Sequence, residues 1–332
     1  MKQPKASLAP PPPPTPEPKQ SKTGLYVLLG FLAFIILSFV FVIYAIQHMV
    51  GHAYTPLLSS SGDITLIEID GPIYESDDIV RRIKHFRKSD RKVLLLRLNS
   101  PGGAVAPSQE IYTEVLKATR EDKKIVVASM ASLAASGAYY IASAATSIVA
   151  NPGTITASIG VIAEFPDAST LLNKVGLKFQ TVKSGKFKDT GGFDRPLSPE
   201  ERAYLQETIN DVFGQFVDSV IDGRRAVLQK KLAVRLGKKP SKVTDQEIRT
   251  YILQYADGRI LTGKKAYELG FIDQLGNYYD AVKLAADLGG IKGDPTIHLD
   301  QPVKWDQLLN NLLPFSPFSK ASRHLELNYL AF

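Results

Sequence analysis

The stretch Met130–Val161, MASLAASGAYYIASAATSIVANPGTITASIGV, decides the fold expected of this chain. It contains no charged residue, and Ser136 lies between the strand-like run Ile125–Ser129 and a run with helical periodicity that starts near Tyr139. A serine between a buried strand and the first turn of a helix faces backbone N–H groups that have no helical partner. This position suits a nucleophile, although a tightly packed junction without any chemistry would use the same small residues.

The segments before this stretch alternate between strands and helices. Val93–Leu98 is almost continuously apolar, as expected for a buried strand, and Ile64–Ile69 is an earlier strand candidate. Helical spacing follows each of them, in Ile79–Phe86 and in Pro107–Leu116. This order predicts an α/β domain with a largely parallel sheet.

Two later segments carry clear boundary signals. Ser198-Pro199-Glu200-Glu201 predicts the start of a long helix, because it combines an N-cap serine, a proline at the first helical position and a glutamate that closes a capping box. Gly258–Asp273 predicts a strand, a turn and a helix that ends at Gly270. The regular pattern ends near Gly289, so we expect a C-terminal arm over residues 290–332. For Trp305–Phe318 two alternatives remain, packing on the domain, which we favour, and binding in an apolar groove as an internal ligand.

The first 62 residues do not belong to this domain. Residues 1–23 combine a proline run with four lysines and one glutamate, which predicts a disordered tail. Residues 24–47 are uncharged and predict one transmembrane helix, since about 20 apolar residues cross a bilayer. All lysines of this region precede the helix, so we expect the tail in the cytoplasm and the domain on the other side. Residues 48–62 are expected to be a linker.

Composition excludes several classes of function. The net charge is +7, and the tail accounts for +3 of it (four lysines minus one glutamate), which leaves too little positive charge for a nucleic-acid surface. The chain has no cysteine, which excludes a thiolate nucleophile, a disulfide and a cysteine-based metal site. We expect no cofactor, no metal and no nucleic-acid partner.

A nucleophilic Ser136 would need a base. None of the five histidines lies between residues 86 and 297, which argues against a Ser-His-Asp triad. The histidines are His48, His52, His85, His298 and His324. A lysine serves as a base only when it is neutral, which burial favours. The segment Thr181–Asp189, TVKSGKFKD, offers three lysines, and its residues alone leave Lys186 and Lys188 as alternatives.

A third element follows the strand Val93–Leu98. Asn99-Ser100-Pro101-Gly102-Gly103 ends in two glycines, which allow a backbone to approach a ligand closely. An N–H group of Gly102 or Gly103, together with that of Gly137, is a candidate oxyanion hole. The same residues would also form an ordinary tight turn.

Four motifs together resemble one family. They are NSPGGAVAPSQEIY, LAASGAYYIASAATSIVANPGTITASIGVI, VKSGKFKD and GRILTGKKAYELGFIDQLG, in this order within Ile64–Ala285. This set resembles the bacterial signal peptide peptidase A family of membrane-anchored serine proteases, in its short, single-unit form. The resemblance implies a Clp-protease/crotonase-like α/β fold over residues 63–289, following the N-terminal transmembrane helix.

The resemblance also implies roles for particular residues. By motif, Ser136 matches the nucleophile of a Ser-Lys dyad, Lys188 matches the general base, and Ser158 matches a serine that orients the lysine. For the oxyanion hole we favour the N–H groups of Gly103 and Gly137.

One position departs from the family pattern. The family usually has two glycines after the serine, whereas this chain has Gly137 followed by Ala138. The added methyl group would narrow the site if this position required a positive φ or touched the substrate.

The resemblance implies an endopeptidase that hydrolyses apolar peptides, chiefly remnant signal peptides, at the bacterial cytoplasmic membrane with its catalytic domain on the extracytoplasmic side. It implies a homo-oligomeric ring in which subunits complete one another's grooves, so Lys188 serves Ser136 of its own or of a neighbouring subunit. Two alternatives remain at this stage. One is a crotonase-type acyl-CoA enzyme, and the other is a membrane-anchored scaffold with an inactive site.

Overall fold

The computed structural model describes residues 63–300 and 328–330. The predicted tail (1–23), transmembrane helix (24–47) and linker (48–62) lie outside the described residues, as does most of the predicted C-terminal arm. Within the described part of the chain, no helix combines the length and the apolar character needed to cross a bilayer.

The predicted α/β domain is confirmed, and its sheet is mostly parallel. The main sheet has eight strands in the order β7-β6-β4-β2-β1-β9, and β5 and β8 continue from β4 off this path. All of its pairs are parallel except β6 with β7. Its strands are β1 (Ile64–Asp70), β2 (Val93–Ser100), β4 (Ile125–Ala135), β5 (Ser147–Ala150), β6 (Ile155–Ala157), β7 (Ile260–Thr262), β8 (Gln274–Leu275) and β9 (Ile297–Leu299).

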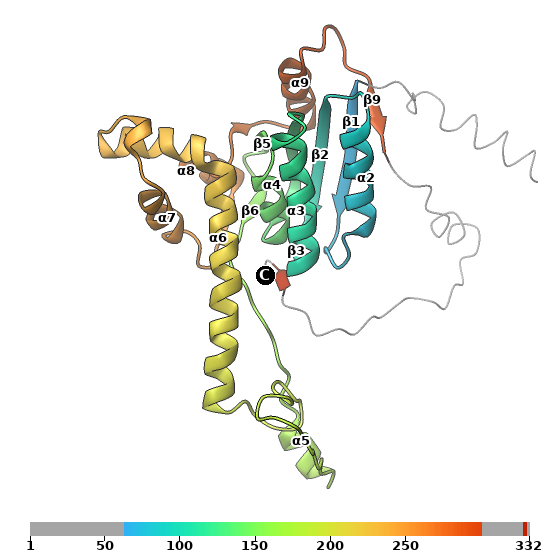
Figure 1. Ribbon diagram of the computed structural model, residues 1–332, viewed down its shortest axis with the longest axis vertical. Coiled ribbons are helices and arrows are strands. Elements are labelled where there is room, and N and C mark those ends of the chain that lie inside the picture. Colours follow the sequence, from blue (N-terminus) through green and yellow to red (C-terminus); the bar gives the residue numbers. More distant parts are fainter. Residues whose placement is uncertain (1–62, 301–327, 331–332) are drawn as a thin grey trace, which may run out of the picture. The chain divides into compact units, whose positions relative to one another are not determined.

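Helices cover both faces of this sheet. Alternate residues of β1, β2 and β4 pack against α2, α3, α4 and α6 on one face, and the residues between them pack against α9 on the other. Figure 1 shows α2 and α3 in front of β1 and β2. The helices are α2 (Asp77–Lys88), α3 (Val105–Arg120), α4 (Gly137–Ser143), α5 (Ser169–Lys174), α6 (Pro199–Leu236), the 3₁₀ turn η1 (Pro240–Lys242), α7 (Asp245–Leu253), α8 (Gly263–Leu269) and α9 (Tyr278–Gly289).

A second, two-stranded sheet joins β3 (Gly102–Ala104) to β10 (Asn328–Leu330) in antiparallel orientation. On its other side β3 forms a parallel bridge to Ile73 through Gly103. The loop predicted from the NSPGG motif is therefore a short strand with neighbours on both sides.

Strand β4 positions the predicted nucleophile because its two halves pair with different strands. Val127–Met130 pair with β5 and Leu133–Ala135 pair with β6, while β2 runs along the opposite side. The chain leaves the sheet directly after Ala135 and enters α4. Ser136 therefore lies at the carboxyl edge of a parallel sheet, where α/β proteins bind their ligands.

The boundary signals of the later helices are confirmed. The Ser198 side chain accepts from the N–H of Glu201, whose carboxylate in turn accepts from the N–H of Ser198, which is the capping box expected at the start of α6. Helix α8 ends at Gly270, which adopts φ 83°. The structure differs from the sequence expectation after Gly289, because β9 adds to the edge of the sheet beside β1. Three residues are too few to show a periodic pattern, so this strand had no sequence signal.

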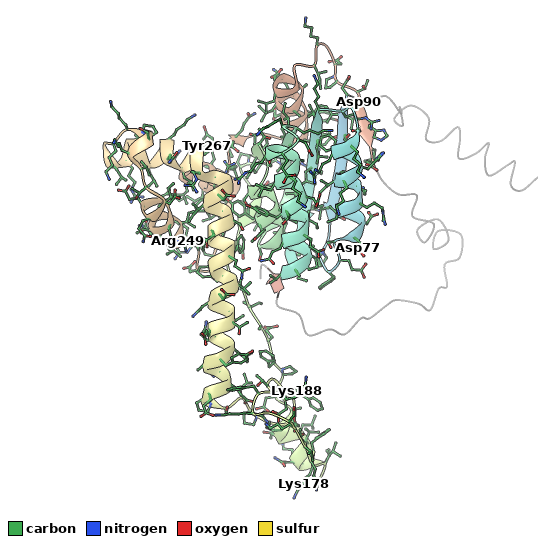
Figure 2. The ribbon with its side chains drawn as sticks, in the orientation of Figure 1. Asp77, Asp90, Lys178, Lys188, Arg249 and Tyr267 are labelled. Atoms are coloured by element: carbon green, nitrogen blue, oxygen red, sulfur yellow. The ribbon has the colours of Figure 1, made fainter. Side chains whose placement is uncertain are left out.

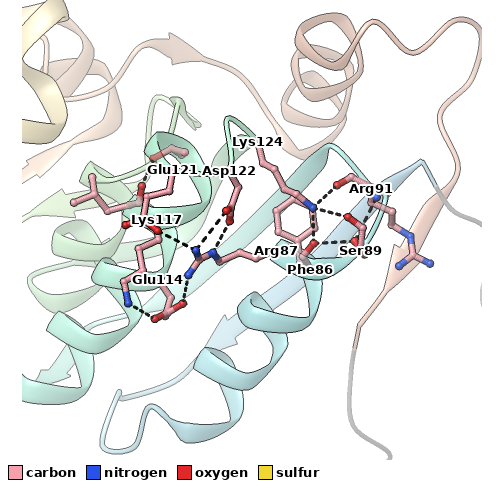
Figure 3. Close-up of polar contacts among 11 residues, drawn as sticks. Phe86, Arg87, Ser89, Arg91, Glu114, Lys117, Glu121, Asp122 and Lys124 are labelled. Carbon is pink, nitrogen blue, oxygen red and sulfur yellow. Dashed lines mark hydrogen bonds and ion pairs between the residues drawn. The ribbon is translucent and has the colours of Figure 1, made fainter.

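A cluster of charges joins α2 to the end of α3 on the face of the sheet that these helices cover. The Arg87 guanidinium donates to Glu114 at 2.8 Å and to Asp122 at 2.5 Å, and Lys117 also donates to Glu114 (Figure 3). The hydrogen bond from Arg87 lowers the pKa of Asp122 below its ordinary value of 3.8. Lys124 donates to three carbonyl oxygens at the end of α2 and so closes the same junction.

We expect Arg87→Met to lower the free energy of unfolding by about 2 kcal/mol at pH 7, because it leaves the largely buried Glu114 short of a partner. A carboxyl whose pKa is lower in the folded than in the unfolded chain stabilises the fold above its unfolded pKa. That contribution is lost as the pH falls through the folded pKa. Arg87 lowers the pKa of Asp122 in this way, so the part of the deficit that comes from Asp122 should shrink as the pH drops below 3.8, the ordinary pKa of that carboxyl.

Denaturant unfolding at pH 7 and pH 3 measures this change. The matched control is Arg81→Met, since Arg81 on the same helix pairs with Asp78 at the surface and should contribute under about 1 kcal/mol. Equal deficits for Arg87→Met at both pH values, or an equal loss in the control, would contradict the assignment.

Candidate active site

Ser136 lies in a strained turn between β4 and α4. Its backbone adopts φ 54° and ψ −119°, a conformation that non-glycine residues rarely occupy. Two hydrogen bonds hold it there. The Ser136 N–H donates to the carbonyl of Ala157 at 2.7 Å, and the Ser136 carbonyl accepts from the backbone N–H of Tyr140 at 2.8 Å. Its side chain is 1% exposed, and its Oγ has no hydrogen-bond partner. Strain and an unpaired buried hydroxyl are features that reactive serines share.

The strain extends to the neighbouring strand. Four described residues other than glycine have a positive φ, and three of them lie here: Ser136, Ala157 and Ser158. Ser158 is 4% exposed, and its Oγ donates to the carbonyl of Gly258 at 3.1 Å. The pairing of β4 with β6 thus brings Ser136 and Ser158 to the same place, as the motif assignment requires.

The loop between β2 and β3 distinguishes its two glycines. Gly102 adopts φ 100°, and its N–H donates to the hydroxyl of Ser100 at 3.1 Å. Gly103 approaches Ile73 so closely that a Cβ on it would lie 2.1 Å from the Ile73 carbonyl oxygen. Gly103 therefore has no room for a side chain, whereas Gly102 is distinguished by its positive φ and by the hydrogen bond from its N–H to Ser100.

Gly103 and Gly137 converge beside Ser136. A Cβ on Gly137 would lie 3.3 Å from the nitrogen of Gly103 and 2.4 Å from Oγ of Ser108. The backbones of the two predicted donors therefore lie close together, and a side chain at position 137 would displace Ser108. Ser108 is fully buried at the start of α3 and bonds to the carbonyl of Ala104. Sequence analysis did not single out this supporting residue, which lies within the NSPGGAVAPSQEIY motif.

The departure at Ala138 does not strain the backbone. Ala138 lies inside α4, is fully buried and is not among the residues with a positive φ. The position therefore accepts the extra methyl group, which faces the protein interior.

Helix α4 is fixed to the elements around it. The Tyr139 hydroxyl donates to the carbonyl of Phe271 at 2.9 Å, and the Tyr140 hydroxyl lies 2.6 Å from Oγ of Ser219 on α6. Burial raises the pKa of both phenols, so both hydroxyls stay neutral. At Gly223 the backbone of α6 approaches Ser143 so closely that a Cβ would lie 1.9 Å from its carbonyl oxygen. Helix α6 is thus coupled directly to the helix that follows the serine.

Lys188 does not lie near Ser136 of the same chain. It belongs to the distal lobe, which we define as residues 161–198, and no residue of this lobe is buried. The lobe packs against the start of α6, where Phe187 stacks on Tyr204 with ring centroids 5.1 Å apart and Arg195 pairs with Glu201 at 2.6 Å. Figure 2 shows Lys188 beside this end of α6, away from the strands of the sheet.

The separation follows from the length of α6. Val212, Phe213 and the buried residues from Phe216 onward pack against the core, whereas no residue from Arg202 to Asp211 is buried. The thirteen residues Pro199–Asp211 span about 20 Å along the helix axis. The structure therefore brings together Ser136, Ser158, Gly103 and Gly137, and holds Lys188 apart from them. Lys186, the alternative base, pairs with Glu200.

The described histidines offer no alternative base. His85 pairs with Asp300 at 3.5 Å, and His298 lies on β9, which β1 and β2 separate from β4. Among the described residues, no group of three or more histidine, aspartate or glutamate side chains is arranged to hold a metal ion.

Comparison with known proteins identifies the family of this site. The model for peptidase family S49 matches residues 118–235, which include Ser136, Ser158 and Lys188. A candidate protease of Synechocystis sp., slr0021, is 40% identical over 238 residues, which are 71% of this chain and 78% of that protein. The chain belongs to the S49 peptidases, the family of signal peptide peptidase A.

Two further relatives are less similar in sequence, and the match covers a smaller share of each of them. The chloroplastic serine protease SPPA of Arabidopsis thaliana is 30% identical over 247 residues, which are 73% of this chain and 33% of that protein. A candidate signal peptide peptidase SppA of Enterococcus faecium is 33% identical over 210 residues, which are 63% of this chain and 55% of that protein.

The strain at Ser136 predicts a stability difference between two inactive variants. Ser136→Gly and Ser136→Ala both remove the hydroxyl, but only glycine adopts φ 54° without strain. We expect Ser136→Gly to be more stable than Ser136→Ala by roughly 1 kcal/mol in denaturant unfolding. An alanine variant as stable as the glycine variant would show that the turn is not strained.

Proposed function

We propose that this chain is a membrane-anchored serine endopeptidase in which Ser136 is the nucleophile and Lys188 is the general base. The observation that carries this proposal is the turn at Ser136, where a buried, unpaired Oγ lies beside the convergent backbones of Gly103 and Gly137. The Arabidopsis relative is named a serine protease, which supports the serine type.

The proposed reaction uses these groups in two steps. Lys188 takes the proton of the Ser136 hydroxyl as Oγ attacks the peptide carbonyl, and the N–H groups of Gly103 and Gly137 stabilise the oxyanion. The C–N bond breaks, and the leaving amine takes the proton from the lysine. A water molecule, deprotonated by the same lysine, then hydrolyses the ester and releases the second product.

We propose that the base comes from a second copy of the chain. A lysine acts as a base only when it is neutral, and burial favours the neutral form. Lys188 is exposed in a single chain, and about 20 Å of helix separates its lobe from the body that holds Ser136. A neighbouring subunit would supply both the burial and the serine.

Exposed apolar side chains support this arrangement. Several lie on the distal lobe and the first half of α6: Ile162, Leu171, Val175, Leu177, Phe179, Val182, Phe187, Phe193 and Tyr204. A patch of this kind marks an interaction surface. Contact between this patch on one copy and the body of the next is heterologous, and repetition of such a contact forms a ring when the rotation between subunits closes.

The proposed substrates are apolar peptides, chiefly remnants of signal peptides in the membrane. The Enterococcus faecium relative carries the name of a signal peptide peptidase, which supports this class. A transmembrane helix at residues 24–47, with the tail in the cytoplasm and the catalytic domain outside, would hold the site close to such peptides and raise their effective concentration.

Complementation between two inactive variants tests the shared site. We expect Ser136→Ala and Lys188→Ala each to abolish hydrolysis of an apolar fluorogenic peptide. Co-assembled in equal amounts, they should regain about one quarter of the wild-type rate, because one site in four combines an intact serine with an intact lysine from the next subunit.

The control is Lys186→Ala, which should stay active alone, since Lys186 is paired with Glu200 at the surface. No recovery in the mixed assembly would mean that each chain uses its own lysine. Full activity of Lys188→Ala alone would remove Lys188 from the mechanism.

A further inference from the structure

The C-terminal part of α6 and the turn after it form a basic segment, which we define as residues 223–244. It contains eight lysine and arginine residues and no acidic residue. Three of the eight pair with acidic side chains of neighbouring elements: Arg224, Arg225 and Lys238. The other five are exposed and form no ion pair with a described residue: Lys230, Lys231, Arg235, Lys239 and Lys242.

Some of these cations share one face of α6 with apolar side chains. A hollow of about 610 Å³ runs along this face, and its lining includes Val227, Lys230, Lys231, Val234 and Arg235. Their spacing of three to four residues places them side by side along the helix. Val234 is 86% exposed, so this apolar side chain has no cover in the single chain.

The remaining lining of the hollow is mostly apolar. It includes the buried residues Leu232, Tyr251 and Leu269, and Arg235 lies over the Tyr251 ring at 5.6 Å. The acidic residue that lines the hollow, Glu268, is paired within α8. A second hollow of about 300 Å³ adjoins the first, since Leu232, Arg235 and Tyr251 line both. The surface therefore combines apolar hollows with cations that no carboxylate neutralises.

An anionic phospholipid matches both features of this surface. Its phosphate attracts the unpaired lysines and arginines, and its acyl chains bury the apolar side chains between them, as at basic amphipathic helices on membranes. A nucleic acid would match the charge but would leave the apolar hollows without a partner. An apolar protein surface would match the hollows but would leave five cations without a counter-charge.

The length of the chain allows this contact. Fifteen residues, 48–62, separate the predicted transmembrane helix from the body, and an extended chain of this length spans about 50 Å. Tyr267, whose ring faces Lys231, lies at one end of α6, and Lys188 lies at the other (Figure 2). A bilayer at the basic segment would therefore leave the apolar patch of the distal lobe free for contact between subunits.

We infer that the basic segment is a second attachment point to the membrane, where it binds the headgroups of anionic phospholipids. The inference rests on the proposed anchor at residues 24–47, which keeps a bilayer within reach, but not on the proposed reaction. A weak contact suffices beside such an anchor, because the anchor makes the second binding event intramolecular. Two attachment points fix the orientation of the body relative to the bilayer, whereas one tether leaves it free to rotate.

A fluorescent probe at position 234 tests this contact in the full chain. Since the chain has no cysteine, Val234→Cys introduces the only thiol, which takes an environment-sensitive nitrobenzoxadiazole label. We expect emission to be roughly twofold stronger in vesicles of phosphatidylcholine with phosphatidylglycerol than in phosphatidylcholine alone. The increase should disappear in about 1 M salt, where the screening length falls to about 3 Å. The same label at Tyr279→Cys on α9, a position that is 78% exposed, should not respond to the lipid.

Charge variants of the labelled chain show whether the lysines cause the response. The test variant replaces three unpaired lysines of the basic segment: Lys230→Gln, Lys239→Gln and Lys242→Gln. We expect it to lose the increase, because each lysine near an anionic surface strengthens binding roughly fivefold. The control variant replaces three exposed lysines in and after α2: Lys84→Gln, Lys88→Gln and Lys92→Gln. It makes the same change in net charge and should keep the increase.

Flotation of the chain with the same vesicles separates this inference from the proposed anchor. A chain that floats with both kinds of vesicle, but whose label responds equally in both or responds fully in the test variant, would overturn the inference. Strong emission already in phosphatidylcholine would also overturn it, since another copy of the chain would then cover the segment. Flotation with phosphatidylglycerol alone would reject the anchor and leave the lipid-binding surface standing. Flotation with neither would reject both.

Discussion

The backbone of Ser136 is the constraint on which the rest of this structure depends. A residue at φ 54° and ψ −119° persists only when its surroundings impose that conformation. Here the N–H of Ser136 is held by β6 and its carbonyl by the first turn of α4. This one turn depends on the parallel pairing of β4 with β2 and β6, on the fixed position of α4 and on the glycines at positions 103 and 137.

The proposed base, Lys188, has no buried surroundings within the single chain. The body around Ser136 is closely packed, and α6 approaches α4 so tightly that only glycine fits at position 223. Beyond Phe216 towards its N-terminus, however, α6 has no buried residue until Glu201, and the distal lobe at that end has none. Helix α6 contacts α4 near its middle, at Ser219 and Gly223, and packs against the distal lobe with Lys188 at its N-terminal end. This arrangement suits the proposed link between the serine of one copy and the lysine of another.

The sequence alone predicts most of the fold, but it predicts only part of the geometry of the site. Continuous apolar runs identify β2 and β4, and the capping box at Ser198 identifies the start of α6, because these signals are local. The capping box predicts a long helix but does not say what packs against it, and no residue from Arg202 to Asp211 is buried in the single chain. The motifs place Ser136 between a strand and a helix, whereas its strained φ depends on pairing with Ala157, which no local pattern encodes. The pairing of β10 with β3 is equally non-local.

The central claim is that Ser136 is a nucleophile whose base is supplied by another copy of the chain. Its most direct test is the reaction of the full chain with a fluorophosphonate, with the adduct located by tandem mass spectrometry in assembled and in diluted, dissociated protein. We expect an adduct on Ser136 that forms rapidly in the assembly and slowly both after dissociation and in Lys188→Ala. An adduct on another residue, or one that forms on Ser136 at the same rate in all three samples, would contradict the claim.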